Sequence, residues 1–248
     1  MKRRKKGKGK GVFILPSLLT SANLFCGFYS IVASVKGLFY PAAVAILIAL
    51  VADGLDGKIA RYTHTTTRFG VEYDSLADLV SFGVAPAILA FMWALMPVGR
   101  LGWLAAFLFV ACGALRLARF NTQVDVVDKR HFVGLPIPAA ATVVATGIIL
   151  AGDIELPFEP RVMALVALYG LSFLMVSTIK YTSFKSLDLV KKRPFNSLVA
   201  VLLVLVVVAM EPHFTIFVLM LGYVASGPLM LAIRGRQAEE QARNIKEA

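Results

Sequence analysis

The sequence predicts an all-α fold, a polytopic membrane helix bundle of about eight transmembrane helices with both termini cytoplasmic. Its 248 residues are 58% hydrophobic and only 17% charged, and the mean hydropathy of +0.75 lies outside the range of soluble domains. The apolar runs are about 17 to 23 residues long, the length a helix needs to cross about 30 Å of hydrocarbon. The basic residues also gather on one side of the predicted membrane, as in polytopic proteins.

Each predicted span is an apolar run bounded by polar residues, Gly or Pro. In chain order the spans cover residues 13–35, 39–56, 74–97, 101–118, 136–152, 161–179, 196–210 and 214–233. The first follows a basic start, but its apolar run is too long for a signal peptide and no small-x-small cleavage site ends it, so we predict an uncleaved helix. The fifth follows Gly134, Pro136 and Pro138. These three cannot all lie in a regular helix, so they predict a shaped entry into that span.

Lysine and arginine orient the bundle. Because the number of spans is even, both termini lie on one face, together with the 57–73 and 180–195 connections. That face holds all 26 basic residues except Lys36, Arg100 and Arg161. By the positive-inside rule it is cytoplasmic, in the cell (inner) membrane. The net charge of +11 then reflects topology and attraction to anionic lipid, and no nucleic-acid partner is expected.

The chain is predicted to form one membrane domain between two short tails. The domain covers residues 12–233, with tails at 1–11 and 234–248. Cys26 and Cys112 lie in separate spans, so we expect packing residues and neither a disulfide nor a metal pair. The histidines show no ligand spacing and are expected to be polar loop residues: His64, His131 and His213.

The strongest local pattern is acidic. Four aspartates lie at the ends of the second and third spans: Asp53, Asp56, Asp74 and Asp78. At 100° per helical residue, the first pair shares one face, about 100° wide, with the small residues Gly57 and Ala60. The second pair is spaced by four residues and also shares a face. Because the 57–73 turn reverses the chain, the two acidic faces can oppose each other.

Converging carboxylates repel each other, and desolvation adds to the cost, unless a cation lies among them. Oxygen-only ligands favour Mg²⁺, Mn²⁺ or Ca²⁺ over zinc, and Mg²⁺ held in this way usually also binds substrate phosphates. Gly57 and Ala60 leave room for a phosphate or nucleotide, while Arg61 and Arg68 can neutralise its oxygens. Two alternatives to a metal site stay open. In the first, the aspartates pair with Lys58 and these arginines in a solvated turn. In the second, they serve an ion-coupled transporter, whose carboxylates usually lie near the bilayer midplane.

The acidic stretch resembles the motif of the CDP-alcohol phosphotransferase family, D-x2-D-G-x2-A-R-x8-G-x3-D-x3-D. Its eight fixed positions are filled without departure by Asp53, Asp56, Gly57, Ala60, Arg61, Gly70, Asp74 and Asp78. The resemblance implies an enzyme that joins a CDP-linked alcohol to a second alcohol and releases CMP, using Mg²⁺ or Mn²⁺ at the cytoplasmic membrane edge. It also implies that the first three aspartates ligate metal and that Asp78 is the general base and a further metal contact. The two glycines, Ala60 and Arg61 would then shape the CDP-lipid site.

Four further stretches resemble the membrane-embedded phosphatidylserine synthases of this family. They are PSLLTSANLFCGF (16–28), RLARFN (116–121), FVGLPIPAAA (132–141) and YTSFKSLDL (181–189). This resemblance implies CDP-diacylglycerol and L-serine as substrates, membrane lipids as surroundings and a homodimer. Glycerol 3-phosphate or an inositol phosphate remains the alternative acceptor.

Three more polar residues are candidates for substrate contacts. Arg116 and Arg119 lie close to a span end on the cytoplasmic face and are candidates for the serine carboxylate, although topology or headgroup contact explains such arginines equally well. Asn23 is a costly polar group inside the first apolar run unless it has a partner. It either reaches the nucleotide or pyrophosphate of the CDP-lipid or forms a helix-to-helix hydrogen bond.

Overall fold

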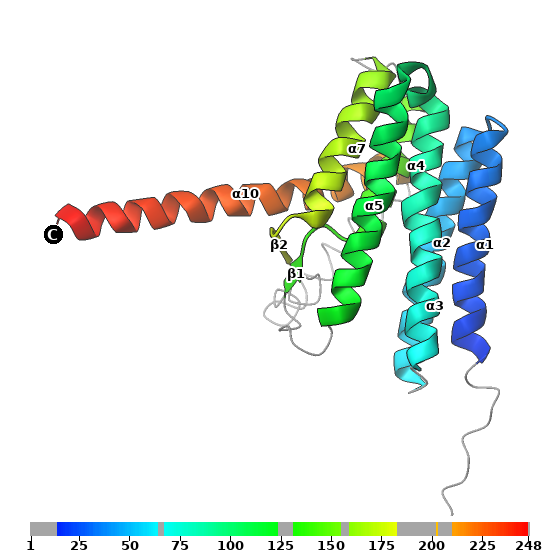
Figure 1. Cartoon of the computed structure of the whole chain (residues 1–248), viewed down its shortest axis with the longest axis horizontal. Helices are drawn as coiled ribbons and strands as arrows, with labels where there is room; N and C mark the ends of the chain where they lie inside the picture. Colours follow the sequence, from blue (N-terminus) through cyan, green and yellow to red (C-terminus); the bar gives the residue numbers. More distant parts are fainter. Residues whose placement is uncertain are drawn as a thin grey trace, which may run out of the picture.

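The computed structural model describes residues 14–63, 67–123, 131–154, 159–182, 202 and 210–247. Within them the helices are α1 (Ile14–Val35), α2 (Phe39–Tyr62), α3 (Arg68–Asp78), η2 (Leu79–Val84), α4 (Ala85–Ala90), η3 (Phe91–Leu95), η4 (Met96–Val98), α5 (Arg100–Gln123), α6 (Ile137–Asp153), α7 (Pro160–Val176) and α10 (Pro212–Glu247). One small antiparallel ladder joins β1 (His131–Val133) to β2 (Lys180–Thr182). Figure 1 shows α1, α2 and the run from α3 to α4 side by side, with α5 and α7 next to them.

The predicted class, an all-α membrane protein, is confirmed. By length and composition, four helical runs of the described residues can cross a membrane: Pro16–Val35, Arg68–Val98, Arg100–Thr122 and Pro212–Leu231. The apolar helices α6 and α7 are shorter, with 17 residues each. The predicted span 196–210 lies outside the described residues, apart from positions 202 and 210.

The predicted 57–73 turn is wrong at both of its ends. Helix α2 continues through Tyr62, and α3 already begins at Arg68, where the side chain of Thr67 accepts a hydrogen bond of 3.0 Å from the N–H of Gly70. Such an N-cap satisfies one of the free amides of the first turn and fixes where the helix begins. Helices α2 and α3 therefore extend into the predicted turn from both sides, and all eight fixed positions of the acidic motif lie on these two helices.

The third span is a single helical run with two widened turns. The first, η2, directly follows Asp78, and the second, η3, precedes the short η4 turn. Pro86 and Pro97 lie just downstream of these turns. Since proline has no N–H to give to the carbonyl four residues earlier, the regular α-helical pattern is interrupted there. The irregularity next to Asp78 therefore follows from the sequence, although the span prediction did not include it.

Helix α1 approaches its neighbours closely through small residues. Gly27 lies against η2, and a Cβ placed on it would collide with Ser81 Oγ and lie 2.7 Å from Ser81 Cα. Helix α2, which packs against α1, has a buried part that is mostly alanine: Ala42, Ala43, Ala45, Ile46 and Ala49. Small side chains at helix interfaces let backbones come together in a bilayer. This close packing brings the polar residues of α1 next to the aspartates of α2 and α3.

Gly27→Ala is expected to lower the midpoint of thermal unfolding in detergent. The added methyl group meets the backbone of Ser81, which cannot move aside as a flexible side chain would, so we expect a cost of about 1–3 kcal/mol. Gly170→Ala in α7 is the matched control, because a Cβ there meets nothing within 4 Å. Equal midpoints for the two variants would contradict the close approach of α1 and η2.

The segment that leads into α6 is not a regular helix, as its Gly and Pro residues predicted. Gly134 has a φ of +81°, which favours glycine, and a Cβ there would collide with the Met175 carbonyl oxygen. Its N–H bonds to the Ile179 carbonyl at 2.9 Å, and the N–H of Leu135 bonds to the Leu174 carbonyl at 3.0 Å. The predicted span 161–179 is too long for the same reason, since α7 ends at Val176 and the carbonyl groups near its end bind the entry segment.

The last described helix does not stop at the predicted residue 233. Helix α10 has 36 residues. Its first part packs against α6, and its C-terminal part projects away from the other helices (Figure 1). It is attached to β2, because Tyr181 donates a hydrogen bond of 3.2 Å to the Val224 carbonyl and a Cβ on Gly227 would lie 2.7 Å from the Tyr181 hydroxyl oxygen. Burial, followed by the influence of Tyr223, raises the pKa of Tyr181 to about 12. The phenol therefore stays protonated and remains a donor.

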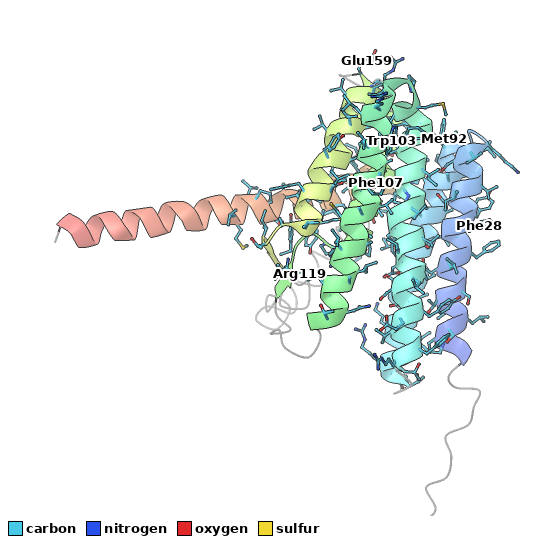
Figure 2. The ribbon with its side chains drawn as sticks, in the orientation of Figure 1. Phe28, Met92, Trp103, Phe107, Arg119 and Glu159 are labelled. Carbon is cyan, nitrogen blue, oxygen red and sulfur yellow. The ribbon has the colours of Figure 1, made fainter. Side chains whose placement is uncertain are left out.

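Large apolar side chains cover the outside of the bundle. Phe28 on α1 is 61% exposed and Phe107 on α5 is 62% exposed, and Figure 2 shows Phe28 pointing away from the bundle. In a soluble protein such side chains would be costly, whereas in a bilayer they contact lipid. The membrane assignment therefore rests on the described surface as well as on composition.

Candidate active site

Two of the aspartates come from the last turns of α2. Asp53 and Asp56 are three residues apart and so lie on the same side of the helix. Asp56 is buried, with 3% of its surface exposed, and its Oδ2 accepts a hydrogen bond of 2.8 Å from Thr20 Oγ1 on α1. Asp53 is half-buried. The Asp56 carboxyl group therefore faces α1.

Helix α3 contributes the third carboxylate. Oxygen atoms of Asp53, Asp56 and Asp74 all lie within 4.8 Å of one another, so the prediction that the acidic faces oppose each other is confirmed for these three residues. Asp74 Oδ1 is buried and has no hydrogen-bond partner among the described residues. Because a buried polar atom without a partner is costly, this oxygen is available to a ligand.

The fourth carboxylate has a different environment. Asp78 lies one turn beyond Asp74, at the end of α3, and its Oδ1 accepts a hydrogen bond of 3.0 Å from Nδ2 of Asn23. Asn23 is fully buried, and its backbone carbonyl accepts a hydrogen bond of 2.9 Å from Ser81 Oγ. Of the two predicted roles for Asn23, the structure shows the helix-to-helix hydrogen bond. Asp78 is thus held by α1 beside the group of three and is not part of it.

The three converging aspartates fit a divalent cation. All the ligand atoms are carboxylate oxygens, without histidine or cysteine, which is the donor set that Mg²⁺, Mn²⁺ and Ca²⁺ prefer. The alternative of a solvated turn predicts pairing with Lys58, Arg61 and Arg68. The structure instead gives Asp56 and Asp78 partners from α1, Thr20 and Asn23. Lys58 and both arginines are exposed. A cation bound among the three aspartates would offset the repulsion between them.

The small residues of the motif leave open space beside the acidic group. A Cβ on Gly57 would meet only the end of the flexible Arg61 side chain, at 3.9 Å, whereas a Cβ on Gly70 would lie 3.2 Å from the Thr67 hydroxyl that caps α3. Gly57 therefore leaves room for a ligand, and Gly70 serves the helix start. Ala60 is on α2 as predicted, but its side chain lies outside the described residues. Arg61 is exposed at the end of α2.

The two predicted serine-binding arginines differ. Arg116 Nε is buried and has no hydrogen-bond partner among the described residues, and the guanidinium lies within electrostatic range of Asp78 and Tyr223. Arg119 lies one turn further along α5 and is half-exposed. In Figure 2 it lies toward the end of α5 that is opposite to Glu159. Of the two, Arg116 is the one connected to the acidic site.

Several contacts of the site were not predicted. Thr20 precedes Asn23 by one turn on α1, and this spacing of two polar residues within an apolar run is a signal that the sequence contains. The hydroxyl of Ser75 accepts a hydrogen bond of 2.9 Å from Asn121 Nδ2, which ties α3 to α5. Ser81 and Tyr223 lie in apolar runs where no spacing distinguishes them. Their roles depend on which helices are neighbours, and a single sequence does not provide that information.

The other polar residues considered from sequence lie elsewhere. His64 is outside the described residues, His131 is in β1 and His213 is at the start of α10. The Nε2 atom of His213 is 3.4 Å from the hydroxyl of Tyr40. Cys26 and Cys112 are free thiols, as expected for packing residues. Among the described residues, the aspartates and their partners on α1 and α5 therefore make up the candidate site.

Comparison with known families decides the classification. The sequence profile of CDP-alcohol phosphatidyltransferases matches residues 13–179, a range that includes the four aspartates, Asn23 and Arg116. The chain belongs to the CDP-alcohol phosphatidyltransferase family. The family is generally dependent on a divalent metal, in agreement with the acidic group. Helix α10 lies outside the matched range.

Within this family, the similar proteins of known name are enzymes whose names include serine. A CDP-diacylglycerol–serine O-phosphatidyltransferase of Helicobacter pylori is 40% identical over 177 residues, 70% of this chain and 74% of that protein. An enzyme of the same name from Bacillus subtilis is 36% identical over 171 residues, 69% of this chain and 91% of that protein. An archaetidylserine synthase of Methanothermobacter thermautotrophicus is 38% identical over 169 residues, 67% of this chain and 69% of that protein. All three names denote transfer to serine.

Proposed function

We propose that this family member transfers the phosphatidyl group of CDP-diacylglycerol to the hydroxyl of L-serine, forming phosphatidylserine and CMP. The observation that carries the proposal is the convergence of three family-motif aspartates on a cation-type site, with a fourth held separately beside them. The relatives' names support serine as the acceptor. An ion-coupled transporter would need no such fourth carboxylate at one membrane edge.

Asp53, Asp56 and Asp74 would hold Mg²⁺ or Mn²⁺, which when bound offsets the negative charge of the pyrophosphate and of the departing CMP. Thr20 keeps the Asp56 carboxylate oriented. The open backbone at Gly57 admits the CDP head, and Ala60, Arg61 and Gly70 complete the CDP-lipid site by their place in the motif. The acyl chains remain in the bilayer.

Asp78 acts as the general base. It accepts the proton of the serine hydroxyl while the serine oxygen bonds to the phosphorus that carries diacylglycerol. The bond from that phosphorus to the bridging oxygen breaks, and CMP leaves with its electron pair. The described site offers no cysteine or histidine nucleophile beside Asp78, which favours one direct displacement. Further contact of Asp78 with the cation belongs to the same proposal.

Serine's carboxylate requires a cationic partner. Arg116 suits this role, because its buried Nε has no hydrogen-bond partner among the described residues and carboxylates bind guanidinium groups in two-point geometry. Arg119, one turn away, is the second proposed contact. A buried donor without a partner is costly unless a ligand meets it.

The finer topology belongs to the proposal too. The apolar runs of the sequence support eight spans, and the distribution of basic residues supports cytoplasmic termini and a cytoplasmic active site. An inner-membrane location is proposed with them. The membrane domain spans 12–233, with polar tails on either side, although helix continues through part of the second tail. A homodimer rests on the family resemblance.

The direct test is CMP release by the purified protein in detergent, with CDP-dipalmitoylglycerol, Mn²⁺ and one acceptor at a time. We expect release with L-serine, and not with glycerol 3-phosphate or inositol phosphate. No release with any acceptor would overturn the enzyme proposal in favour of transport. Release with glycerol 3-phosphate alone would keep the family chemistry and overturn the acceptor.

Chelation is expected to abolish CMP release, because the three carboxylates then repel each other and the pyrophosphate charge is not offset. Adding Mn²⁺ or Mg²⁺ in excess of EDTA should restore the rate, and titration of each ion gives its apparent affinity. Ca²⁺ is the informative comparison, since it accepts the same ligands but prefers six to eight of them with longer bonds. Full activity in EDTA would contradict a cation among the aspartates.

A further inference from the structure

Two buried polar atoms of opposite hydrogen-bonding character flank Asp78. Oδ1 of Asn23, an acceptor, and Nε of Arg116, a donor, are both buried and have no hydrogen-bond partner among the described residues. Asn23 is directly bonded to Asp78, and Arg116 lies within electrostatic range of the same carboxylate. A ligand that satisfies both atoms must bring a donor to α1 and an acceptor to α5.

The orientation of the Asn23 amide is fixed by its surroundings. A carboxylate accepts hydrogen bonds, so the Nδ2 group must face Asp78, and the carbonyl Oδ1 is directed elsewhere. The Ser81 hydroxyl holds the Asn23 backbone, and the missing side chain of Gly27 allows this approach. The side chain is completely buried. Leaving a buried acceptor without a donor is costly. Asn23 Oδ1 also belongs to the side chain that is bonded to Asp78, so it is placed to meet a ligand of the acidic site.

We propose that Asn23 is the residue that selects an amino-acid acceptor: its Oδ1 accepts a hydrogen bond from the ammonium group of serine, while its Nδ2 positions Asp78. This inference rests on the proposed function. It adds that the ammonium group of serine is the part of the acceptor that the enzyme recognises. In serine, the hydroxyl and ammonium groups are on adjacent carbons. One Asn23 side chain can therefore hold the base next to the hydroxyl and accept from the ammonium group.

The chemistry of the ligand favours the ammonium group over the pyrophosphate. Phosphate oxygens only accept hydrogen bonds, as does Asn23 Oδ1, so a pyrophosphate contact would leave this atom unsatisfied. An ammonium group is a charged donor, and it is attracted to the nearby carboxylates. The zwitterion of serine then matches the site at both ends, with its ammonium at Asn23 and its carboxylate at Arg116. Glycerol 3-phosphate and inositol phosphate have no donor of that charge.

The test compares serine with 3-hydroxypropanoate, which has the hydroxyl and the carboxylate but no ammonium group. The readout is the ratio of the Ki of 3-hydroxypropanoate, as a competitor of serine, to the KM of serine. A general loss of base positioning affects both compounds, so the ratio isolates the ammonium contact. In Asn23→Leu we expect this ratio to fall about 10- to 100-fold, the effect of one charged hydrogen bond. An unchanged ratio in a folded variant that still binds CDP-diacylglycerol would overturn the proposal.

Asn23→Asp keeps an acceptor oxygen but loses the Nδ2 donor. We expect kcat to fall while the ratio stays at or above that of the wild type, and this variant decides the question if the leucine variant does not fold. A ratio lowered in Asn23→Asp would count against the ammonium contact. Ser30→Ala is the matched control, because Ser30 is another fully buried side chain of α1 whose Oγ has no partner among the described residues. Its ratio should equal that of the wild type. Failure of the proposed function would instead appear as absent CMP release from wild-type protein with serine.

Discussion

Asp78→Asn is expected to lower kcat for phosphatidyl transfer by about 10²- to 10⁴-fold, the usual contribution of a general base, while CDP-diacylglycerol binding is retained. The amide has nearly the same shape as the carboxyl group but cannot accept the serine proton. The three converging carboxylates do not include Asp78, so its neutralisation should leave three of the proposed cation ligands, and with them the CDP-lipid, in place. Turnover is measured by CMP release, and binding by titration with CDP-diacylglycerol in the absence of serine.

Glu72→Gln is the control for this variant. Glu72 is on the same helix, carries the same charge and is exposed, so it reports any effect of a lost negative charge at the membrane edge. Its turnover should match that of the wild type. If Asp78→Asn turns over as fast as Glu72→Gln, Asp78 is not the base. If it loses CDP-lipid binding as well as turnover, its main role is in the cation site.

Asp74→Asn is expected to have opposite effects on activity and on the stability of the metal-free protein. Loss of a ligand should weaken Mn²⁺ binding by at least about 10- to 100-fold, and activity should fall with it. The same change removes one of three carboxylates whose oxygens lie within 4.8 Å of one another. In EDTA the variant should therefore unfold at a higher temperature than the wild type, because on the order of 1–3 kcal/mol of repulsion is relieved.

Thermal unfolding in detergent, followed with and without Mn²⁺, measures this effect. The wild type should gain stability from Mn²⁺, because a ligand that binds only the folded state stabilises it. Asp74→Asn should gain much less, so the order of the two midpoints reverses between EDTA and Mn²⁺. Glu72→Gln again serves as the control and should follow the wild type. If Asp74→Asn is less stable than the wild type in EDTA, the Asp74 carboxylate has a structural partner and is stabilised without a cation.

The acidic site was predictable because its information is local. Spacings of three and four residues place side chains on one face of a helix whatever the rest of the fold does. Asp53 and Asp56 were therefore paired correctly, and the confirmed approach of Asp74 required only a chain reversal between two helices. The shaped entry at Gly134 was predictable for the same reason, since Gly and Pro restrict the backbone at their own positions.

The ends of the helices and the tertiary contacts of their residues were harder to predict from the sequence. The predicted turn 57–73 is too long, because the polar residues at its two ends continue the helices, α2 to Tyr62 and α3 from Arg68. The predicted end of the 161–179 span was wrong because carbonyl groups of that segment bind Gly134 and Leu135. These are contacts between distant parts of the chain, and no local propensity encodes them.

By itself, the sequence determined that this protein is a helical membrane protein, which family motif it carries and which four aspartates belong to that motif. Composition, periodicity and spacing are local properties and are readable one segment at a time. Only the tertiary structure decided that the carboxylates divide into a group of three and a separate Asp78, because that division depends on α1. The packing of Gly27 against Ser81 brings Thr20 to Asp56 and Asn23 to Asp78, and such contacts exist only once the helices have assembled.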